Sequence, residues 1–229
     1  MSDASETDIY KEIKKAIIQQ RLRPNMQLVE EVLAESFGVS RTPIRNVLRR
    51  LAHEKMVKII PHKGTFVSCP TVEEAKEVFE MRRVLEGAAI RKACKQITGE
   101  HLHQLELLIN EEHAARDHGD LFQVLQITCD FHLEIAKIAG NSYYNRYIEE
   151  LISLNYVIMA FYGRRQLTLC GLQEHAQILN ALNQRDENQA EKLMLEHLQH
   201  IEAYLDFDEM PSTPSALNEI FKPSTHSLY

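Results

Sequence analysis

The sequence of 229 residues lacks several features that would place it in particular protein classes. It contains no tryptophan, and its 8 glycines and 7 prolines are few, which favours a helix-rich protein over a loop-rich β-sandwich. Its longest apolar run, Tyr156 to Tyr162, has 7 residues, whereas a membrane-spanning helix needs about 20. Residues 1–15 lack the apolar segment of a secretory signal. We therefore expect a soluble, cytoplasmic protein with no membrane partner.

Cysteine is also scarce, and no two cysteines are close in the sequence. The chain has 4 of them, separated by 25, 35 and 41 residues, namely Cys69, Cys94, Cys129 and Cys170. A zinc knuckle needs CxxC-like spacing, and stable disulfides are rare in the cytosol. We therefore expect reduced thiols in a cytosolic protein.

Positive charge is in deficit, with 26 Lys and Arg against 33 Asp and Glu and a formal charge of -7. Taken over the whole chain, this balance argues against a nucleic-acid partner, because phosphate binding needs positive surface. The charge is unevenly distributed, however. Residues 1–70 hold 12 basic and 8 acidic side chains, a net +4, whereas residues 71–229 hold 14 and 25, a net -11. The whole-chain average therefore hides a basic N-terminal region.

The N-terminal region begins with two short helical patterns. Residues 9–18 place four isoleucines on one face, and Pro24-Asn25 ends that pattern, since Asn25 tolerates a left-handed turn. A second helix is predicted over 28–37 and ends at Gly38. Its inward-facing residues are expected to be Val29, Val32, Leu33 and Phe37.

A third helix follows Gly38, and its exposed face is basic. Thr42 is predicted to be its N-cap and Pro43 its first helical residue. Its apolar positions share one side and are Ile44, Val47, Leu48 and Leu51. Two helices joined by a glycine-containing turn form a helix-turn-helix, whose second helix enters the DNA major groove. The predicted DNA contacts are Ser40, Arg41, Thr42, Arg45 and Arg49. The arginines among them can pair with guanine and reach phosphates.

Two β-branched runs then predict a hairpin with a basic tip. Residues 57–60 and 65–68 are separated by Pro61 to Gly64. The hairpin would form the wing of a winged helix-turn-helix, and its tip, His62, Lys63 and Gly64, is predicted to approach the minor groove. A helix-turn-helix alone occurs in many proteins that do not bind DNA. The three arginines and the basic wing together favour DNA binding.

From residue 71 to 207 the apolar pattern has a helical period throughout. The predicted helices lie at about 71–97, 99–118, 121–139, 142–163, 169–184 and 186–207. We therefore predict a mainly α protein: a winged helix-turn-helix of three helices and a β-hairpin over 1–70, followed by an all-α bundle of six or seven helices over 71–208. Residues 209–229 are rich in Pro and Ser and predict a peripheral or partly disordered tail.

The second region contains three histidines that stand apart from the other 8. Most histidines lie on polar faces, but His132, His175 and His197 each sit in an apolar stripe of a different helix. A single histidine in such a place is more often a hydrogen-bonded core residue. Three on three helices predict a metal site, because imidazole suits zinc, nickel and copper and helical bundles build such sites from facing helices.

The N-terminal region resembles the DNA-binding domain of GntR-type bacterial transcription regulators. The similar segments are Leu22–Pro24, the SRTPIR-containing stretch Leu33–Leu51, and Pro61–Val67. The second region resembles the helical FCD ligand domain of the FadR branch, in Met81–Ala89, Phe131–Asn141, Glu174–Leu182 and Asp186–Ile201. The sequence departs from the family at Gln20, Asn25 and Lys55, where glycine is usual, and at Asn46, where glutamate is usual.

The resemblance implies a metal site made of one aspartate and three histidines. His132, His175 and His197 match its histidines, but Thr128 stands in place of the aspartate. The nearby Asp130 lies roughly 200° round the helix from that position. Two interpretations stay open: a site for a divalent transition metal, zinc or nickel, and a metal-free polar pocket.

The resemblance also implies that a small carboxylate effector binds near this site. The expected effector-binding residues are Arg82, Thr128, His132, His175 and His197. Arg82 matches an arginine that faces the effector cavity in the family, and a carboxylate would satisfy its guanidinium. The alternative is a structural pair with Glu86, four residues later on the same helix.

The hypothesis that follows is a transcription regulator, most often a repressor in this family. It would bind a pseudo-palindromic operator in double-stranded DNA as a homodimer and respond to the small carboxylate effector. Two alternatives from other classes are a metal-dependent hydrolase built on the helical bundle and a winged-helix module for protein interactions. The hydrolase would need a general base beside the metal, and Glu174 is the only carboxylate close to these histidines in the sequence.

Overall fold

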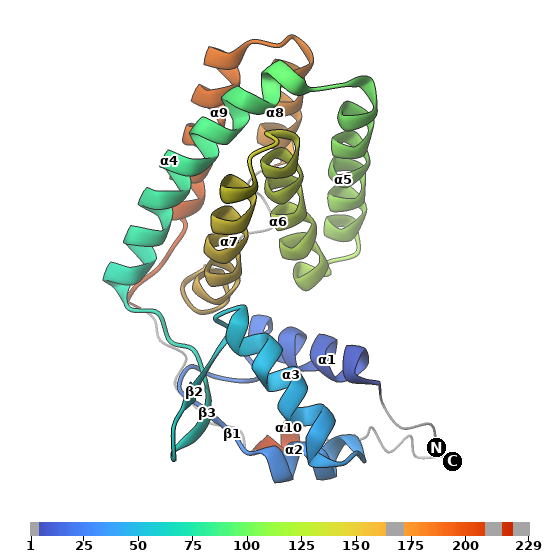
Figure 1. Cartoon of the computed structure of the whole chain (residues 1–229), viewed down its shortest axis with the longest axis vertical. Helices are drawn as coiled ribbons and strands as arrows, with labels where there is room; N and C mark the ends of the chain where they lie inside the picture. Colours follow the sequence, from blue (N-terminus) through green and yellow to red (C-terminus); the bar gives the residue numbers. More distant parts are fainter. Residues whose placement is uncertain (1–4, 164–171, 209–216, 222–229) are drawn as a thin grey trace. The chain divides into compact units, whose positions relative to one another are not determined.

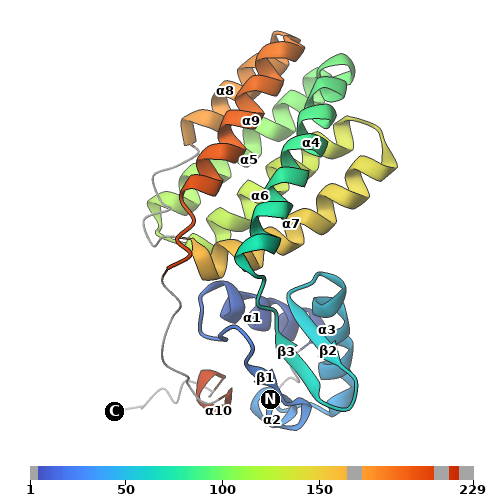
Figure 2. The same ribbon diagram turned by 90° about the vertical axis from the view of Figure 1, so that its left-hand side faces the viewer.

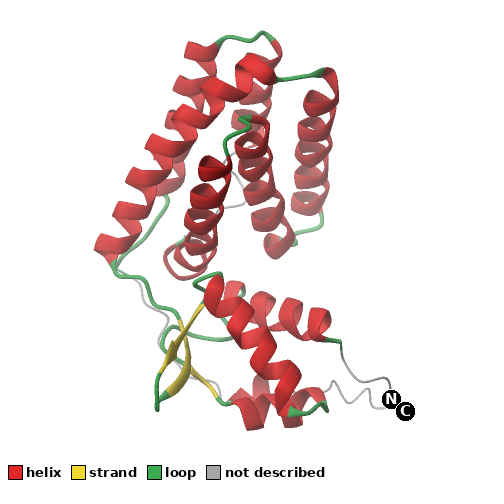
Figure 3. Ribbon diagram, viewed as in Figure 1, coloured by secondary structure: helices red, strands yellow, loops and turns green. Residues whose placement is uncertain are grey.

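The computed structural model describes residues 5–163, 172–208 and 217–221 (Figure 1). These residues are predominantly helical, with strands confined to one small sheet (Figure 3). This confirms the predicted mainly α fold, a winged helix-turn-helix followed by a helical domain. The elements are α1 (Glu6–Ile18), β1 (Gln27–Leu28), α2 (Glu30–Phe37), α3 (Arg41–His53), β2 (Val57–Ile60), β3 (Gly64–Val67), α4 (Val72–Gln96), α5 (Gly99–Asp117), α6 (Leu121–Ile138), α7 (Ser142–Tyr162), α8 (Leu172–Asn183), α9 (Glu187–Ala203) and α10 (Leu217–Ile220).

The described residues form two compact units. The first contains those within 1–70, 156–161 and 209–229, and the second those within 71–155 and 162–208. No helix in the described ranges combines the length and apolar character needed to cross a bilayer. Of the four cysteines, Cys69, Cys94 and Cys129 are free thiols, while Cys170 lies outside the described residues.

In the first unit, α1, α2 and α3 enclose an apolar core. Its fully buried side chains include Ile9, Ile13, Ile17, Leu33, Ile44, Leu48 and Leu51. Gly38 has a left-handed backbone, with φ of 66°, and its N–H caps the end of α2. Because glycine has no Cβ, it adopts this conformation at little cost, and the chain can reverse directly into α3.

The start of α3 differs from the prediction. Ser40, rather than Thr42, is the N-cap, so the helix begins at Arg41 and Pro43 is its third residue. Proline is tolerated there because N–H groups in the first turn have no acceptor within the helix. The proline therefore marked the first turn but not the first residue.

The wing is a three-stranded antiparallel sheet in the order β1-β3-β2. The predicted hairpin pairs Val57 with Val67 and Ile60 with Gly64. β1 is an addition: Leu28, predicted to begin a helix, pairs with Thr65, and Val29, predicted to face inward, is 39% exposed. A strand of two residues is too short to produce an alternating pattern, so the sequence carried no signal for it.

The C-terminal helix α10 also belongs to the first unit and packs against α2 (Figure 2). The ring of Phe221 lies 5.1 Å from that of Phe37, and Arg21 Nη1 donates to the carbonyl of Ile220. Leu217 and Phe221 are each 9% exposed. The described part of the predicted tail is therefore buried against the helix-turn-helix.

The second unit is a bundle of six helices, α4 to α9. α4 packs on α6 and α9, α5 packs on α6 and α8, and α8 packs on α9. The helix predicted over 169–184 is described from Leu172, because 169–171 lie outside the described residues. Thr71 and Glu74 form a capping box that begins α4, the longest helix. The inward faces of these helices carry the candidate site.

Four residues other than glycine adopt left-handed backbone in the described part of the first unit, one of them His62 in the turn of the wing. The other three are Gln20, Asn25 and Lys55, with φ of 58°, 61° and 58°, the positions at which the resemblance implies glycine. Asparagine tolerates this conformation, as predicted for Asn25. Lysine pays a steric cost of about 1–2 kcal/mol because its Cβ approaches the following carbonyl.

We expect Lys55→Gly to raise the free energy of unfolding by about 0.5–1 kcal/mol. Relief of the left-handed strain exceeds the extra conformational entropy that glycine gives the unfolded chain. Chemical denaturation measures the change. Lys58→Gly, in strand β2, is the control and should lower stability. Equal losses in both variants would contradict the assignment of strain to Lys55.

Candidate histidine site and nucleic-acid interface

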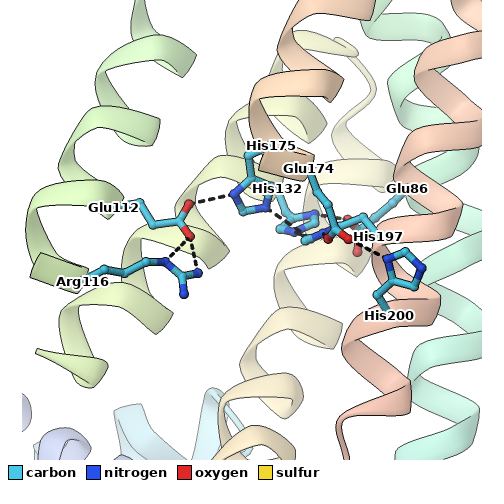
Figure 4. A network of polar contacts seen from close by, with 8 residues as sticks. All are labelled: Glu86, Glu112, Arg116, His132, Glu174, His175, His197 and His200. Atoms are coloured by element: carbon cyan, nitrogen blue, oxygen red, sulfur yellow. Dashed lines mark hydrogen bonds and ion pairs between the residues drawn. The ribbon is translucent and has the colours of Figure 1, made fainter. Parts of the chain in front are cut away.

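Three buried histidines meet inside the second unit (Figure 4). His132 comes from α6, His175 from α8 and His197 from α9, and none is more than 2% exposed. The Nε2 atom of His197 lies 3.2 Å from Nε2 of His132 and 3.2 Å from Nε2 of His175. The structure therefore brings together the three histidines that the sequence singled out.

The Nδ1 atom of each imidazole contacts the carboxylate of a glutamate on another helix. The Nδ1 contacts are His132 to Glu86 of α4 at 2.5 Å, His175 to Glu112 of α5 at 2.7 Å, and His197 to Glu174 of α8 at 2.7 Å. An ionised carboxylate only accepts hydrogen bonds, so each Nδ1 carries the proton and donates it. Each Nε2 then presents a lone pair to the centre of the cluster.

A cationic or proton-donating side chain supports each glutamate. Arg82 Nε donates to Glu86 at 2.7 Å, Arg116 Nη2 to Glu112 at 2.6 Å, and His200 Nδ1 to Glu174 at 2.5 Å. Both arginine pairs join residues one helical turn apart. Figure 4 shows Arg116 and His200 beside Glu112 and Glu174, each contacting the glutamate that contacts a histidine of the cluster.

The carboxylates stay ionised despite their burial. Burial alone raises the pKa of Glu86, but the positive charge of Arg82 and the hydrogen bond from His132 outweigh it and bring the pKa to about 2. The same balance, with hydrogen bonds from histidine opposing burial, brings the pKa of Glu112 and of Glu174 to about 2. All three glutamates are therefore acceptors at neutral pH.

Burial has the opposite effect on two of the imidazoles, those of His132 and His197, and favours their neutral form. It lowers the pKa of His132, and it lowers that of His197 to about 3, with Glu86 and Glu174 respectively opposing the shift. Where two neighbouring Nε2 atoms both carry lone pairs, those lone pairs face one another at 3.2 Å and repel. A divalent cation between them would remove the repulsion, and carboxylate-oriented histidines are its usual ligands. The donor set can therefore hold zinc or a similar metal.

Thr128 stands at the position where the resemblance implies an aspartate ligand. Thr128 lies on α6, one turn before His132, and is half-buried. Among the described residues, the converging group contains only the three histidines and no carboxylate. The converging side chains therefore provide no anionic ligand.

Arg82 forms the structural pair that was one of the two alternatives, and one of its donors has no partner among the described residues. It is 1% exposed and forms the buried pair with Glu86, which is the structural alternative. Its Nη1 atom, however, is buried without a hydrogen-bond partner among the described residues. A donor left unpaired in this way costs about 1–3 kcal/mol and would favour an anionic ligand.

Sequence reasoning missed the residues behind the histidines. Glu86 was considered only as a partner of Arg82, and Glu112, Arg116 and His200 were not singled out. Glu112 carried a usable signal, because it continues the apolar stripe of Leu105 and Ile109 at helical spacing and precedes Arg116 by four residues. Asn155 of α7 was also missed: it is 4% exposed, and its Oδ1 has no partner in the described part of the chain.

In the first unit, the predicted DNA contacts share the beginning and the exposed face of α3. Ser40, Arg41, Thr42, Arg45 and Arg49 are all exposed. Arg45 forms a two-point contact with Glu30 at the start of α2, from Nε at 3.2 Å and from Nη2 at 2.8 Å. Arg41 Nη2 contacts Glu31.

The predicted wing tip is an exposed turn between β2 and β3. His62 has a left-handed backbone, with φ of 61°, and Gly64 has φ of 113°. A Cβ on Gly64 would lie 2.9 Å from Nε2 of Gln27, whose amide donates to the carbonyl of Lys63. The backbone conformation therefore favours glycine here, whereas the end of the flexible Gln27 side chain could move to admit a Cβ.

Comparison with known proteins assigns each unit to a described class. Residues 6–67 match the model of the bacterial regulatory proteins of the gntR family, and residues 77–200 match that of the FCD domain. The chain is 26% identical to the HTH-type transcriptional repressor RspR of Escherichia coli K12, over 84% of this chain and 85% of that protein. It is 25% identical to the uncharacterized regulator YdhC of Bacillus subtilis, over 83% and 86%.

Solved structures show the same fold. Escherichia coli McbR/YncC superposes with a TM-score of 0.71 at 21% identity, over 89% of this chain and 97% of that one. A GntR regulator from Rhodococcus sp. RHA1 superposes with a TM-score of 0.70 at 22% identity, over 86% and 95%. At these identities the likeness supports the arrangement of elements rather than any ligand.

We expect Glu174→Gln to weaken zinc binding by about 10–100-fold, because it removes the carboxylate that orients and polarises His197. Glu174 is 26% exposed, so its loss disturbs the core less than loss of Glu86 or Glu112. Competition with a chromophoric chelator at neutral pH measures the affinity. Glu196→Gln on α9 is the charge-matched control, and equal affinities in the two variants would contradict the role of Glu174.

Proposed function

Because the chain belongs to the GntR family of bacterial regulatory proteins and carries an FCD domain, we propose that it is a transcriptional repressor whose operator binding responds to a small carboxylate. The family consists of transcription regulators rather than enzymes, so the histidine cluster is not assigned to hydrolysis. The repressor role is supported by the relative RspR, which is named a transcriptional repressor.

The observation that carries the proposal is the basic surface of the first unit. Arg41, Arg45 and Arg49 occupy the exposed side of a helix that follows a helix-turn-helix turn, and a basic wing accompanies it. In such a fold this helix enters the major groove, where arginine reads guanine and contacts phosphates. We assign base and phosphate contacts to the three arginines with Ser40 and Thr42, and minor-groove contact to the tip His62, Lys63 and Gly64.

A homodimer follows from how such regulators read DNA. Two copies place their α3 helices in successive major grooves, roughly 34–36 Å apart, so the operator would be pseudo-palindromic. An operator on chromosomal DNA also requires the protein to act in the cytoplasm. The salt dependence of binding would report how many phosphates the two copies contact.

In the second unit, the three histidines would hold a divalent metal, zinc or nickel. When bound, the metal would supply a positive centre that attracts a carboxylate. Arg82 would direct its unpaired Nη1 to the anionic effector, and Thr128 would leave room at the site because it provides no anionic ligand. A ligand that binds one conformation of the dimer better would shift its population and so its operator binding.

The DNA-binding function is tested with Arg45→Ala. Duplexes are first selected from a randomised library by the wild-type protein. We expect the variant to bind a selected duplex about 10–100-fold more weakly, because a two-point arginine–guanine contact is worth about 1–3 kcal/mol. Arg91→Ala on α4 removes the same charge from the second unit and serves as the control. Equal affinities in the two variants, with no log-linear loss of affinity in salt, would contradict DNA binding through α3.

The metal site is tested with Thr128→Asp. We expect tighter zinc or nickel binding, by about tenfold or more, because the variant adds an anionic ligand one turn before His132. Isothermal titration calorimetry measures the affinity, and Thr128→Asn, of similar size but uncharged, is the control. Identical affinities in both variants would show that this position does not face the histidines.

A further inference from the structure

Two acidic residues at the beginning of α2 contact two of the arginines assigned to DNA. Glu30 and Glu31 are the first residues of α2, and their partners are Arg45 and Arg41 of α3. The side chains of Arg45 and Glu30 are 50% and 33% exposed, so the pair lies at the surface that would meet DNA. A surface ion pair adds little to folding stability, about 0–1 kcal/mol, which suggests that this pair serves something other than the fold.

The geometry of the Glu30 contact leaves Arg45 able to read a base. Glu30 engages the edge of the guanidinium formed by Nε and Nη2. A guanidinium has a second, end-on edge formed by its two terminal nitrogens, and this edge is the one that pairs with O6 and N7 of guanine. A single carboxylate therefore occupies one edge and points the other in a fixed direction.

The contact also changes what Arg45 can do electrostatically. The hydrogen bond from Arg45 lowers the pKa of Glu30, so the carboxylate is ionised at neutral pH and the pair is neutral overall. A neutral pair releases no counterion when it approaches a phosphate, whereas a free arginine does. Arg49, one turn further along α3, forms no ion pair within the described ranges, so no carboxylate competes there with a phosphate for its guanidinium.

We propose that Glu30 is a positioning residue that makes Arg45 a reader of guanine rather than a binder of phosphate. The proposal rests on the DNA-binding function proposed above. The carboxylate fixes the direction of the guanidinium before DNA binds, so the Arg45 side chain loses less conformational entropy on binding. It also repels phosphates that would otherwise attract Arg45 at any sequence. Glu30 thereby increases the difference between operator and non-specific DNA.

The experiment compares Glu30→Gln with Glu35→Gln in the full-length protein. Both variants remove one negative charge from α2, at the half-buried Glu30 and at the exposed Glu35, but Glu35 forms no ion pair in the described part of the chain. Binding is measured on a duplex selected by the wild-type protein, on its single-base-pair variants and on a scrambled duplex, across a salt series. These readouts separate positioning from stability, because partial unfolding would weaken binding to every duplex by the same factor.

We expect Glu30→Gln to lower discrimination at one base-pair position of each half-site by about tenfold. We also expect tighter binding to the scrambled duplex and a salt slope steeper by about 0.9 for each copy of the chain, since Arg45 becomes free to contact a phosphate. Glu35→Gln should change neither the discrimination nor the slope by that amount. In an Arg45→Ala background, Glu30→Gln should have no further effect on discrimination.

Two results would overturn the proposal. Identical discrimination profiles for Glu30→Gln and Glu35→Gln would show that Glu30 contributes only charge, and a loss of discrimination that persists in the Arg45→Ala background would show that it does not act through Arg45. Failure of the wild-type protein to enrich any duplex would overturn the DNA-binding function itself, and the role of Glu30 with it.

Discussion

The convergence of three buried imidazole Nε2 atoms is the arrangement on which the polar network of the second unit depends. Carboxylates accept from Nδ1 of His132, His175 and His197, so the Nε2 atoms of the three rings face one another. The carboxylates are in turn ionised because Arg82 and other proton donors neutralise them. Removing one member of such a buried pair leaves an uncompensated charge and costs about 3–5 kcal/mol, so five helices of the bundle are held in mutual register by this network.

The first unit uses the same chemical device at its surface, with a different result. A carboxylate of α2 orients a guanidinium of α3 as the buried glutamates orient the imidazoles. In the interior, the carboxylates orient the histidine Nε2 atoms toward the place where a cation would bind. At the surface, Glu30 would orient Arg45 toward a guanine and weaken its attraction to phosphates. In both places, a second residue decides what the contacting residue can recognise.

Much of this organisation was predictable because it rests on patterns that are local in the sequence. The 3.6-residue period located the helices, and the uneven charge separated a basic region from an acidic one. The failures have physical reasons. β1 is too short to alternate, and Pro43 restricts only the first turn and therefore left the N-cap open between Ser40 and Thr42. The partners of the histidines are 46, 63 and 23 residues away, and no local period reports such distances.

The sequence by itself determined the fold class, the family resemblance and the identity of the residues with unusual chemistry, because helical period, turn residues and motif spacing are properties of neighbouring positions. Only the tertiary structure decided which carboxylate each histidine would contact, that Arg82 has one donor without a partner among the described residues, and that Arg45 contacts Glu30. Those pairings depend on which helix faces place side chains from distant segments within hydrogen-bond reach. That outcome is settled by packing, in which every element of the unit takes part.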